Sequence, residues 1–405
     1  ARIAAAEAEL DAAEATVRRL APTALTTARG PDLPDAAAVA AALPPGTLLL
    51  TYHTFDEDLV GWAVTRDGLR AERRRRWAGE VTATARRFHG GCAHGDSDGP
   101  AAARALATWL LDPFAAELDS HPRVLVVPPP SLSLLPFHVL PWDGDTLGDR
   151  HVVSYLPAAS LLTRARRWDT PWARARTLLV GDPDLAPGTG LAPLPGTGVE
   201  AASIARLLPG ARLLTGPDAS RDRVLAAAPE CEVLHLATHG QVDDLSPSRS
   251  RLALTGTDTL DMADLIDCAR APRLLVLSAC DSGRGTATAG GDVLGLTRAA
   301  MITGAHGAVV SLWPVGDLTG CLVMTRMYER LTDGTAADVP TALHHAQQEV
   351  RTMTGAERRD QYRELAAAAD APPSAPGTRD SEALAAPAAV DRAPRHWAPF
   401  IHVGV

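Results

Sequence analysis

The sequence predicts an α/β fold in which a mostly parallel sheet carries helices on both faces. From residue 177 onward, short apolar runs alternate with segments of helical character, and this alternation is typical of parallel strands joined by helices. The runs 231–238, 273–279 and 307–313 are rich in Val, Leu and Ala and are bounded by polar or glycine-rich sequence. Strands that are buried on both faces have this pattern, so these runs are expected to form the centre of the sheet.

Residues 1–45 are expected to form an N-terminal helix and a proline-rich linker. Residues 1–20 are strong helix formers with a narrow apolar stripe, and such a helix needs a packing partner. Residues 21–45 contain five prolines and are typical of a linker. The chain opens at Ala1 rather than Met, which is compatible with a piece of a longer protein. The helix is interpreted either as packing on the body that follows or as the last helix of an upstream helical array.

Residues 46–170 are expected to form one unit that begins with an antiparallel meander. Three runs of strand-forming residues follow one another after residue 47, and Arg66-Asp67-Gly68 marks the second turn between them. The other elements expected in this unit are a helix over 100–111, a buried strand over 123–127, an irregular packed segment over 134–142, and a strand with a turn over 151–162.

Residues 171–405 are expected to form the second unit, with a regular alternation of strands and helices. The predicted strands are 177–185, 211–216, 231–239, 273–280, 307–315 and 396–405, and the predicted helices are 196–208, 219–228, 260–268, 292–303, 318–331 and 339–352. The segment at about 354–395 is rich in Ala, Pro, Arg and Asp and has no periodicity. It is predicted to be a flexible insertion.

Composition and charge argue against several classes of protein. The chain has 405 residues, with 39 Lys and Arg against 48 Asp and Glu, and a formal net charge of −9. This acidic balance argues against a general binder of nucleic acid or of an anionic membrane. The one basic cluster, Arg73–Arg76, is interpreted as a solvated face beside a hairpin. The sequence shows neither an apolar window as long as a membrane span nor a secretory signal.

The five cysteines are scattered, without a CxxC spacing or a His/Cys metal pattern. We therefore expect no disulfide framework, no metal site and no cofactor, and a reducing, cytoplasmic compartment fits this usage. The many Ala, Arg and Pro residues are typical of proteins from GC-rich bacterial genomes.

The two histidines of the run 231–239 receive different interpretations. His235 lies in the middle of the predicted strand and is interpreted as a hydrogen-bonded core residue. His239 lies where that strand ends, and Gly240 and a polar loop follow it. Ligands and chemistry collect at the carboxyl ends of strands in open parallel sheets, so His239 is a candidate functional residue. Gly240 allows a ligand to approach the backbone closely and leaves its N–H free to donate.

Cys280 is the candidate nucleophile. It ends the predicted strand 273–280 and is followed by Asp281-Ser282-Gly283, which indicates a loop rather than core. That loop leads through two glycines to a predicted helix, and backbone N–H groups at such a turn stabilise a thiolate. The role of a small buried apolar residue fits Cys231, Cys268 and Cys321 instead.

His239 and Cys280 together supply what thiol attack on an amide needs. The reaction requires a base for the thiol proton and two N–H donors for the developing oxyanion, and the amides of Gly240 and Cys280 are natural donors. His239 precedes Cys280 by 41 residues. This agrees with caspase-type sequences, in which the His precedes the Cys by about 50 residues.

These motifs resemble the CHAT domain, a caspase-like group related to separase and gingipain. The resemblance is carried by LHLATHG, LLVLSACDSG and GAVVSLWPVGD around the two candidate residues. VLVVPPPSLSLLPFHVLPW and VVSYLPAASLL resemble the N-terminal part of the same domain, and HWAPFIHVGV resembles its closing strand. The resemblance covers roughly residues 47–405.

The resemblance implies a caspase-like cysteine endopeptidase that acts on a protein or peptide. His239 matches the catalytic histidine of the family and Cys280 its nucleophile, while the amides of Gly240 and Cys280 match the oxyanion donors. Residues 46–170 resemble a pseudo-protease half, and 171–405 the catalytic half. Such domains commonly follow helical repeats, so a helical-repeat sensor region or an activating partner is expected.

The residues that select a substrate are less well defined. Caspases have Gly two residues after the Cys, whereas Asp281-Ser282 precede Gly283 here, so cleavage after Asp is not expected. Asp281, Asp292 and Asp317 lie near the expected strand-end edge, where an acidic pocket would select a basic residue before the scissile bond. Asp292 and Asp317 are alternatively carboxylates at helix N-termini. Trp313 either lines a substrate groove or fills core.

Other function classes were compared with the peptidase. A catalytically silent caspase-like scaffold or interaction module remains the alternative, because a fold does not fix an activity. A serine α/β hydrolase is disfavoured because the sequence has no G-x-S-x-G motif. GDPDLAPGTG, after the strand 177–185, lacks the Lys and Ser/Thr of a phosphate-binding loop.

Overall fold

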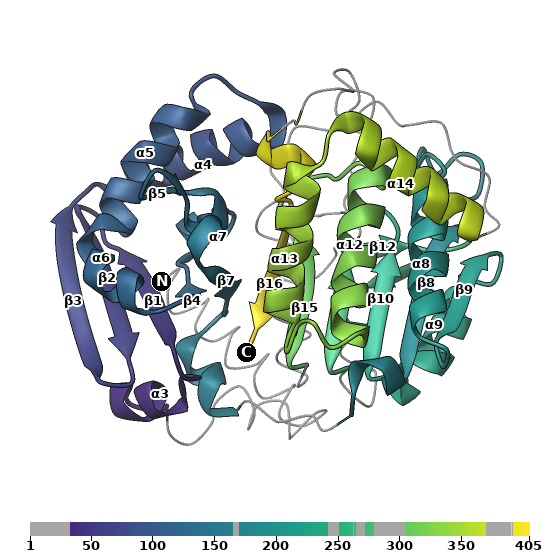
Figure 1. Ribbon diagram of the computed structural model, residues 1–405, viewed down its shortest axis with the longest axis horizontal. Helices are drawn as coiled ribbons and strands as arrows, with labels where there is room; N and C mark the ends of the chain where they lie inside the picture. Colours follow the sequence, from purple (N-terminus) through teal and green to yellow (C-terminus); the bar gives the residue numbers. More distant parts are fainter. Residues whose placement is uncertain are drawn as a thin grey trace, which may run out of the picture.

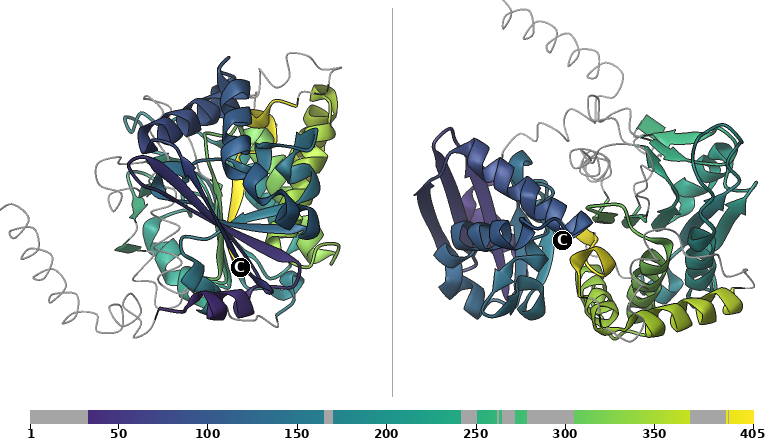
Figure 2. Two further views of the ribbon diagram at one scale, coloured as in Figure 1. Left: turned by 90° about the vertical axis from the view of Figure 1, so that its left-hand side faces the viewer. Right: turned by 90° about the horizontal axis from the view of Figure 1, so that it is seen from above.

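One eleven-stranded sheet runs through the protein (Figure 1). The computed structural model describes residues 33–164, 170–241, 251–261, 263–264, 272–278, 305–369, 390 and 392–405. The strand order is β3-β2-β1-β4-β7-β16-β15-β14-β10-β8-β9, and the strands fan out with the usual twist (Figure 2). Neighbouring strands in this sheet are parallel, except for the antiparallel pairs β1–β2, β2–β3 and β15–β16. The fold is therefore the mostly parallel α/β fold that the sequence predicts.

The N-terminal half begins with the antiparallel meander expected from the sequence, which the pairing confirms. Its strands are β1 (Thr47–Thr54), β2 (Asp58–Thr65), β3 (Gly68–Arg75), β4 (Arg123–Val127), β5 (Pro141–Trp142), β6 (Asp145–Thr146) and β7 (Val152–Tyr155). Its helices are α3 (Ala36–Ala42), α4 (Ala78–His94), α5 (Gly99–Leu110), α6 (Ala115–Ser120) and α7 (Leu147–Arg150).

Alternate residues of β1 enter two different cores. Leu48 and Leu50 belong to the large core under α4 and α5, whereas Leu49 belongs to a smaller core with residues of α3. This alternation is the two-residue period of a strand that is covered on both faces. Helix α3 lies in the segment that the sequence indicated as linker. Asp35 begins it by accepting a hydrogen bond of 2.8 Å from the Ala38 N–H, a strong local signal for a short helix.

The C-terminal half contains the rest of the sheet and a small three-stranded sheet. Its strands are β8 (Thr177–Pro183), β9 (Arg212–Gly216), β10 (Val233–Ala237), β11 (Gly240–Gln241), β12 (Arg251–Ala253), β13 (Thr259–Asp261), β14 (Leu274–Leu277), β15 (Gly307–Ser311) and β16 (Phe400–Gly404). Its helices are α8 (Pro195–Leu207), α9 (Arg221–Ala227), α12 (Asp317–Thr332), α13 (Val339–Thr352) and α14 (Gly355–Ala368).

Two sequence predictions for this half are wrong in part. The segment 354–395 was expected to be a flexible insertion, but residues 355–368 form helix α14. Thr354 and Glu357 form a capping box at its start, and Tyr362 is buried, so local capping and tertiary packing override the weak periodicity. The helix expected from residue 260 is also incorrect at its start, because Leu260 lies in β13. The helices expected over 1–20 and 292–303 lie outside the described residues.

Strand β16 joins the two halves. It pairs antiparallel with β15 over five residue pairs and parallel with β7 through Val403 and Tyr155. Helix α13 packs over both β16 and β7, and the Gln348 Nε2 donates a hydrogen bond of 2.9 Å to the Gly148 carbonyl. One strand and a partly polar seam, defined here as the contact of β7 and α7 with α13 and β16, thus help to hold the halves together.

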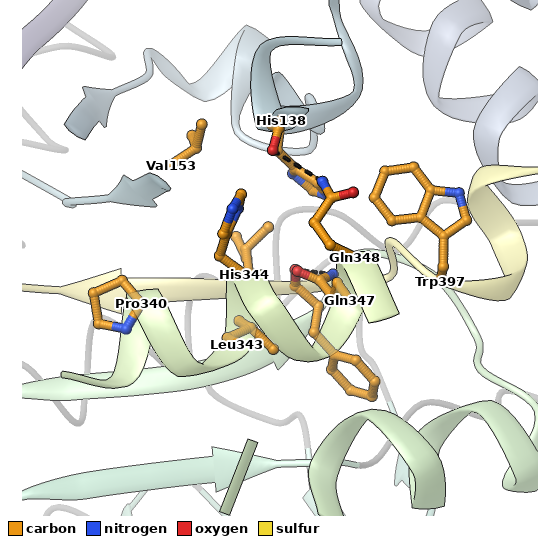
Figure 3. Close-up of a pocket in the computed structure, with 11 residues that line it drawn as sticks. His138, Val153, Pro340, Leu343, His344, Gln347, Gln348 and Trp397 are labelled. Carbon is orange, nitrogen blue, oxygen red and sulfur yellow. Dashed lines mark hydrogen bonds between the residues drawn. The ribbon is translucent and has the colours of Figure 1, made fainter. Parts of the chain in front are cut away.

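A small, partly open cavity of about 20 Å³ lies at this seam (Figure 3). This space is enough for roughly one water molecule. Its lining residues are His138, Gly148, Val153, Pro340, Leu343, His344, Gln347, Gln348, Trp397, Phe400 and Ile401. Two of its histidines, His138 and His344, have pKa values lowered to about 4, chiefly by burial. The cavity is therefore a packing gap between the halves, with neutral imidazoles on its wall at neutral pH.

Acidification is expected to weaken this seam. Burial lowers the pKa of His138 and of His402 to about 4, and in His402 nearby Asp338 opposes this while Arg123 adds to it. The corresponding pKa in an unfolded chain is near 6.5. Because the folded-state pKa is the lower one, stability is fully present above about pH 6.5 and is lost as the pH falls toward 4. The expected loss is on the order of 1–3 kcal/mol per histidine.

Urea unfolding at about pH 7 and about pH 4.5 measures this loss. We expect His402→Gln to lose less stability on acidification than the wild type, because Gln takes up no proton. His53→Gln is the matched control, since His53 is exposed and its replacement is expected to leave the acid loss unchanged. An equal acid loss in His402→Gln and wild type would contradict the assignment.

Candidate active site

His239 lies just beyond the end of β10, between the strands β14 and β8 of the sheet. Its side chain is 1% exposed, and its Nε2 lies 2.6 Å from the carbonyl oxygen of Ala192. A carbonyl can only accept a hydrogen bond, so Nε2 carries the proton. In the neutral ring Nδ1 then has the lone pair, and among the residues that the structure describes this buried Nδ1 has no hydrogen-bond partner. The ring is therefore fixed as an acceptor at Nδ1.

The small sheet β11-β12-β13 fixes the backbone around His239. The Ala253 N–H donates a hydrogen bond of 2.9 Å to the His239 carbonyl, and the Thr238 hydroxyl donates one of 2.6 Å to the Ala253 carbonyl. Gly240 pairs with Leu252 in this register. The neighbouring pair of His239 and Ala253 is hydrogen-bonded. In an antiparallel ladder the next pair, Gly240 and Leu252, is then not hydrogen-bonded, so the Gly240 N–H points away from β12. The oxyanion role of this N–H stays a prediction.

Cys280, the predicted nucleophile, lies outside the described residues, as do Asp281 and Asp292. Strand β14, which leads to Cys280, is described and pairs in parallel with β10, with Leu236 opposite Leu277. Along the chain, His239 and Cys280 each follow that pair by three residues. The register of the two strands is therefore compatible with the predicted dyad, which stays a prediction.

Asp317 is the first residue of α12, yet it contacts a different helix. Its Oδ2 accepts a hydrogen bond of 3.3 Å from the Gly196 N–H, in the first turn of α8. Gly316 is the N-cap of α12 and has no side chain with which to cap it. The carboxylate therefore bonds the N-terminus of α8 while it also lies in the first turn of its own helix, and it lies on the carboxyl side of β15. Its predicted role in substrate binding is untested by this geometry.

Trp313 lies two residues after β15 and is 2% exposed. Its ring meets that of His89 in α4 edge to face, with 5.8 Å between the ring centroids. The His89 Nε2 in turn donates a hydrogen bond of 2.8 Å to the Leu312 carbonyl. Of the two roles considered from the sequence, this packing favours that of a core residue, and a contact with substrate stays a prediction.

His235 is the hydrogen-bonded core histidine that the sequence predicts. It is 0% exposed, and its Nε2 lies 2.8 Å from Oε1 of Glu200 in α8. Its Nδ1 lies 3.3 Å from the hydroxyl of Tyr328 in α12. Both partners are themselves buried. The network ties β10 to the two helices that cover it, four residues before His239.

Asp182, near the end of β8, was missed by the sequence analysis. Its φ is +44°, in the left-handed region, which Asp tolerates better than most residues. Its N–H donates a hydrogen bond of 2.9 Å to the Thr197 hydroxyl. Burial raises the pKa of Asp182, a hydrogen bond from the Leu194 amide opposes this, and Asp184 adds to the increase. The signal available in the sequence was an Asp between Gly and Pro at a strand end.

Two kinds of feature are absent from the described residues. No group of three or more His, Cys, Asp or Glu side chains is placed to hold a metal ion there. Within the same residues, no helix is both long and apolar enough to cross a membrane.

The model of the CHAT domain family matches residues 100–405 of this chain. The chain belongs to the CHAT domain family. The match begins within α5, whereas the resemblance in the sequence was placed from residue 47. Mouse tetratricopeptide repeat protein 28 is 25% identical to this CHAT domain over 292 residues, which are 58% of this chain and 12% of that protein. The chain thus spans about an eighth of the length of this relative.

Of two solved structures that match this CHAT domain, separase has a TM-score above 0.5. In the separase–securin complex of Saccharomyces cerevisiae, separase matches with a TM-score of 0.52 and 10% identity, over 91% of this chain and 30% of that one. The Arg-specific cysteine proteinase gingipain R matches with a TM-score of 0.43 and 9% identity, over 80% of this chain and 74% of that one. The likeness to separase shows that this CHAT domain has the caspase-like fold expected from the sequence.

Proposed function

We propose that this CHAT domain is a cysteine endopeptidase in which His239 is the base and Cys280 the nucleophile. The observation that carries the proposal is the state of the His239 ring. Its Nε2 proton is held by the Ala192 carbonyl, and its Nδ1 is buried without a partner among the described residues. A buried, unpaired acceptor at a strand end is costly for stability, and accepting a proton from a thiol is a function that accounts for it.

The proposed reaction proceeds in two stages. The Cys280 thiol gives its proton to the His239 Nδ1, and the sulfur attacks the carbonyl carbon of the scissile amide. The N–H groups of Gly240 and Cys280 stabilise the resulting oxyanion. As the C–N bond breaks, the protonated ring donates its proton to the leaving amine. Water, with His239 again as base, then cleaves the thioester and restores the thiol.

The Ala192 carbonyl has a defined part in this scheme. While the ring is protonated, it carries a positive charge that the carbonyl dipole, 2.6 Å from Nε2, stabilises. The same contact prevents the ring from turning over, so that Nδ1 keeps its direction. A backbone carbonyl thus orients the base, as a carboxylate does in a Ser-His-Asp triad.

We propose a specific protein as the substrate and a helical-repeat region or a partner as the regulator. The relative that matches this chain in part is named for tetratricopeptide repeats, and residues 1–20 have the sequence character of a helix that needs a partner. Substrate selection is proposed to involve Asp281 and Asp317, with preference for a basic residue before the cleaved bond.

The test is incubation with a diverse peptide library, comparing the wild type with Cys280→Ala. We expect the wild type to cleave a subset of peptides and the variant to cleave none of them, because the bond to sulfur cannot form. The matched control is Cys231→Ala, which removes a buried thiol that bonds the Ala227 carbonyl and is expected to keep cleavage. Cleavage that persists in Cys280→Ala would contradict the proposal. A folded wild type that cleaves no peptide or protein partner would favour the silent scaffold.

A further inference from the structure

The segment 192–197, here called the support loop, comprises the three residues before α8 and the first turn of that helix, and it is contacted by groups at three strand ends. His239, beyond β10, donates a hydrogen bond to the carbonyl of Ala192, the first residue of the support loop. The backbone N–H of Asp182, near the end of β8, donates a hydrogen bond to the hydroxyl of Thr197, the last residue of the support loop. Asp317 beyond β15 accepts from its Gly196 N–H. The support loop therefore connects the predicted base to two carboxylate-bearing residues that lie elsewhere in the sequence.

The support loop has little conformational freedom of its own. Pro193 and Pro195 each fix one backbone angle and have no N–H to donate. A residue before proline is disfavoured in the α-helical region, which restricts Ala192 and Leu194, and Leu194 has φ −122° and ψ 58°. The loop therefore moves as a stiff piece, and a group that sets its position also sets the direction of the Ala192 carbonyl.

Asp182 is the residue that sets this position most directly. Its backbone N–H bonds the Thr197 hydroxyl, which in turn donates a hydrogen bond of 2.7 Å to the Leu194 carbonyl. Its carboxylate receives a hydrogen bond from the Leu194 amide. A Cβ added at Gly198 would lie 3.4 Å from the Asp182 Oδ2, so the carboxylate lies against the first turn of α8. Backbone and side chain of one residue thus hold both ends of Leu194.

We propose that Asp182 is a positioning residue for His239, which it orients through the support loop and the Ala192 carbonyl. This inference rests on the proposed peptidase function. The left-handed backbone at Asp182 turns its N–H toward Thr197 and its carboxylate toward Leu194, so that Ala192, two residues earlier, presents its carbonyl to Nε2. Without this anchor the loop shifts, the carbonyl leaves Nε2, and the proton redistributes between the two ring nitrogens.

The first test observes the imidazole itself, by ¹⁵N NMR of the histidine-labelled chain. It uses the Cys280→Ala background, and the His239 resonances are assigned by their loss in His239→Gln. We expect the Nε2-protonated tautomer in the background protein. Asp182→Gly, which keeps a left-handed backbone but removes the carboxylate, is expected to show a mixture of tautomers. Asp182→Asn tolerates the same backbone and keeps an acceptor oxygen, so it is expected to retain the single tautomer.

Two further variants keep the result decisive. Asp184→Asn is the matched control, because it removes an exposed carboxylate two residues away and is expected to leave the tautomer unchanged. Thr197→Val removes the acceptor of the Asp182 N–H and is expected to act in the same direction as Asp182→Gly, so it replaces that variant if Asp182→Gly does not fold. An unchanged His239 tautomer in Asp182→Gly and in Thr197→Val would overturn the proposal.

The second test is kinetic and separates this proposal from the peptidase proposal. On a cleaved peptide, Asp182→Gly is expected to lower kcat by roughly 10- to 100-fold with little change in KM, and Asp182→Asn to restore most of it. A loss confined to KM for peptides with a basic residue before the cleaved bond would place Asp182 in a substrate pocket and overturn the proposal. A tautomer change in Asp182→Gly, together with a wild type that cleaves nothing, would support the positioning role while rejecting the peptidase.

Discussion

His239→Ala is expected to lower kcat/KM for a cleaved peptide by about 10²- to 10⁴-fold, the usual contribution of a general base. The variant loses the acceptor at Nδ1, so the Cys280 thiol has no group to take its proton. It also loses the bond to Ala192 and leaves a small void, because the ring is 1% exposed. We therefore expect a moderate destabilisation of roughly 1–3 kcal/mol. Turnover and urea unfolding of the same preparation measure both effects.

The control for this prediction is His53→Ala, which truncates an exposed histidine of β1 and is expected to change neither quantity. The prediction requires activity to fall far more than stability can explain. If His239→Ala remained folded at the assay temperature and still turned over at near the wild-type rate, His239 would be a core residue and not the base.

His235→Ala is expected to have the opposite profile, with a destabilisation of about 3–5 kcal/mol. The substitution leaves the Glu200 carboxylate, which is 2% exposed, without its imidazole partner 2.8 Å away. A buried carboxyl group that loses its partner is among the most costly defects that a single substitution can produce. The midpoint of urea unfolding measures the effect, with an unchanged slope showing that the transition stays two-state.

A double replacement distinguishes this cause from the simple loss of packing. His235→Leu with Glu200→Leu removes both polar groups, and we expect it to be markedly more stable than His235→Ala, because no buried polar group is left without its partner. If the double variant were as unstable as His235→Ala, the loss would come from the cavity and from the missing contact with Tyr328 rather than from Glu200.

The parts of the fold predicted well are those in which burial alone decides the structure. The apolar run that became β10 is buried at each of its five residues, and so is that of β15. Runs of this kind have few alternatives to a covered strand. Helix α14 was missed for the converse reason. Its exposed face is polar, and its stability comes from a capping box and from contacts with α12 and α8, which a periodicity analysis does not contain.

The sequence analysis also did not predict that both halves share a single continuous sheet. The closing strand β16 was expected, but not its place between β15 and β7. A strand's own residues indicate that it is buried, whereas its neighbours depend on the whole topology. Its position turns two separately predicted halves into one sheet, with the histidine-lined seam between them.

His239 shows most clearly what each level determines. The sequence by itself determined that an imidazole follows a buried strand and precedes a glycine, and family resemblance paired it with Cys280. The tertiary structure decided which ring nitrogen carries the proton, because the partner of Nε2 is a carbonyl 47 residues away, in a loop positioned from β8. Apolar spacing records burial, but the hydrogen bonds of a buried polar group come from other elements. Only the packing of those elements determines which atoms of such a group donate and which accept hydrogen bonds.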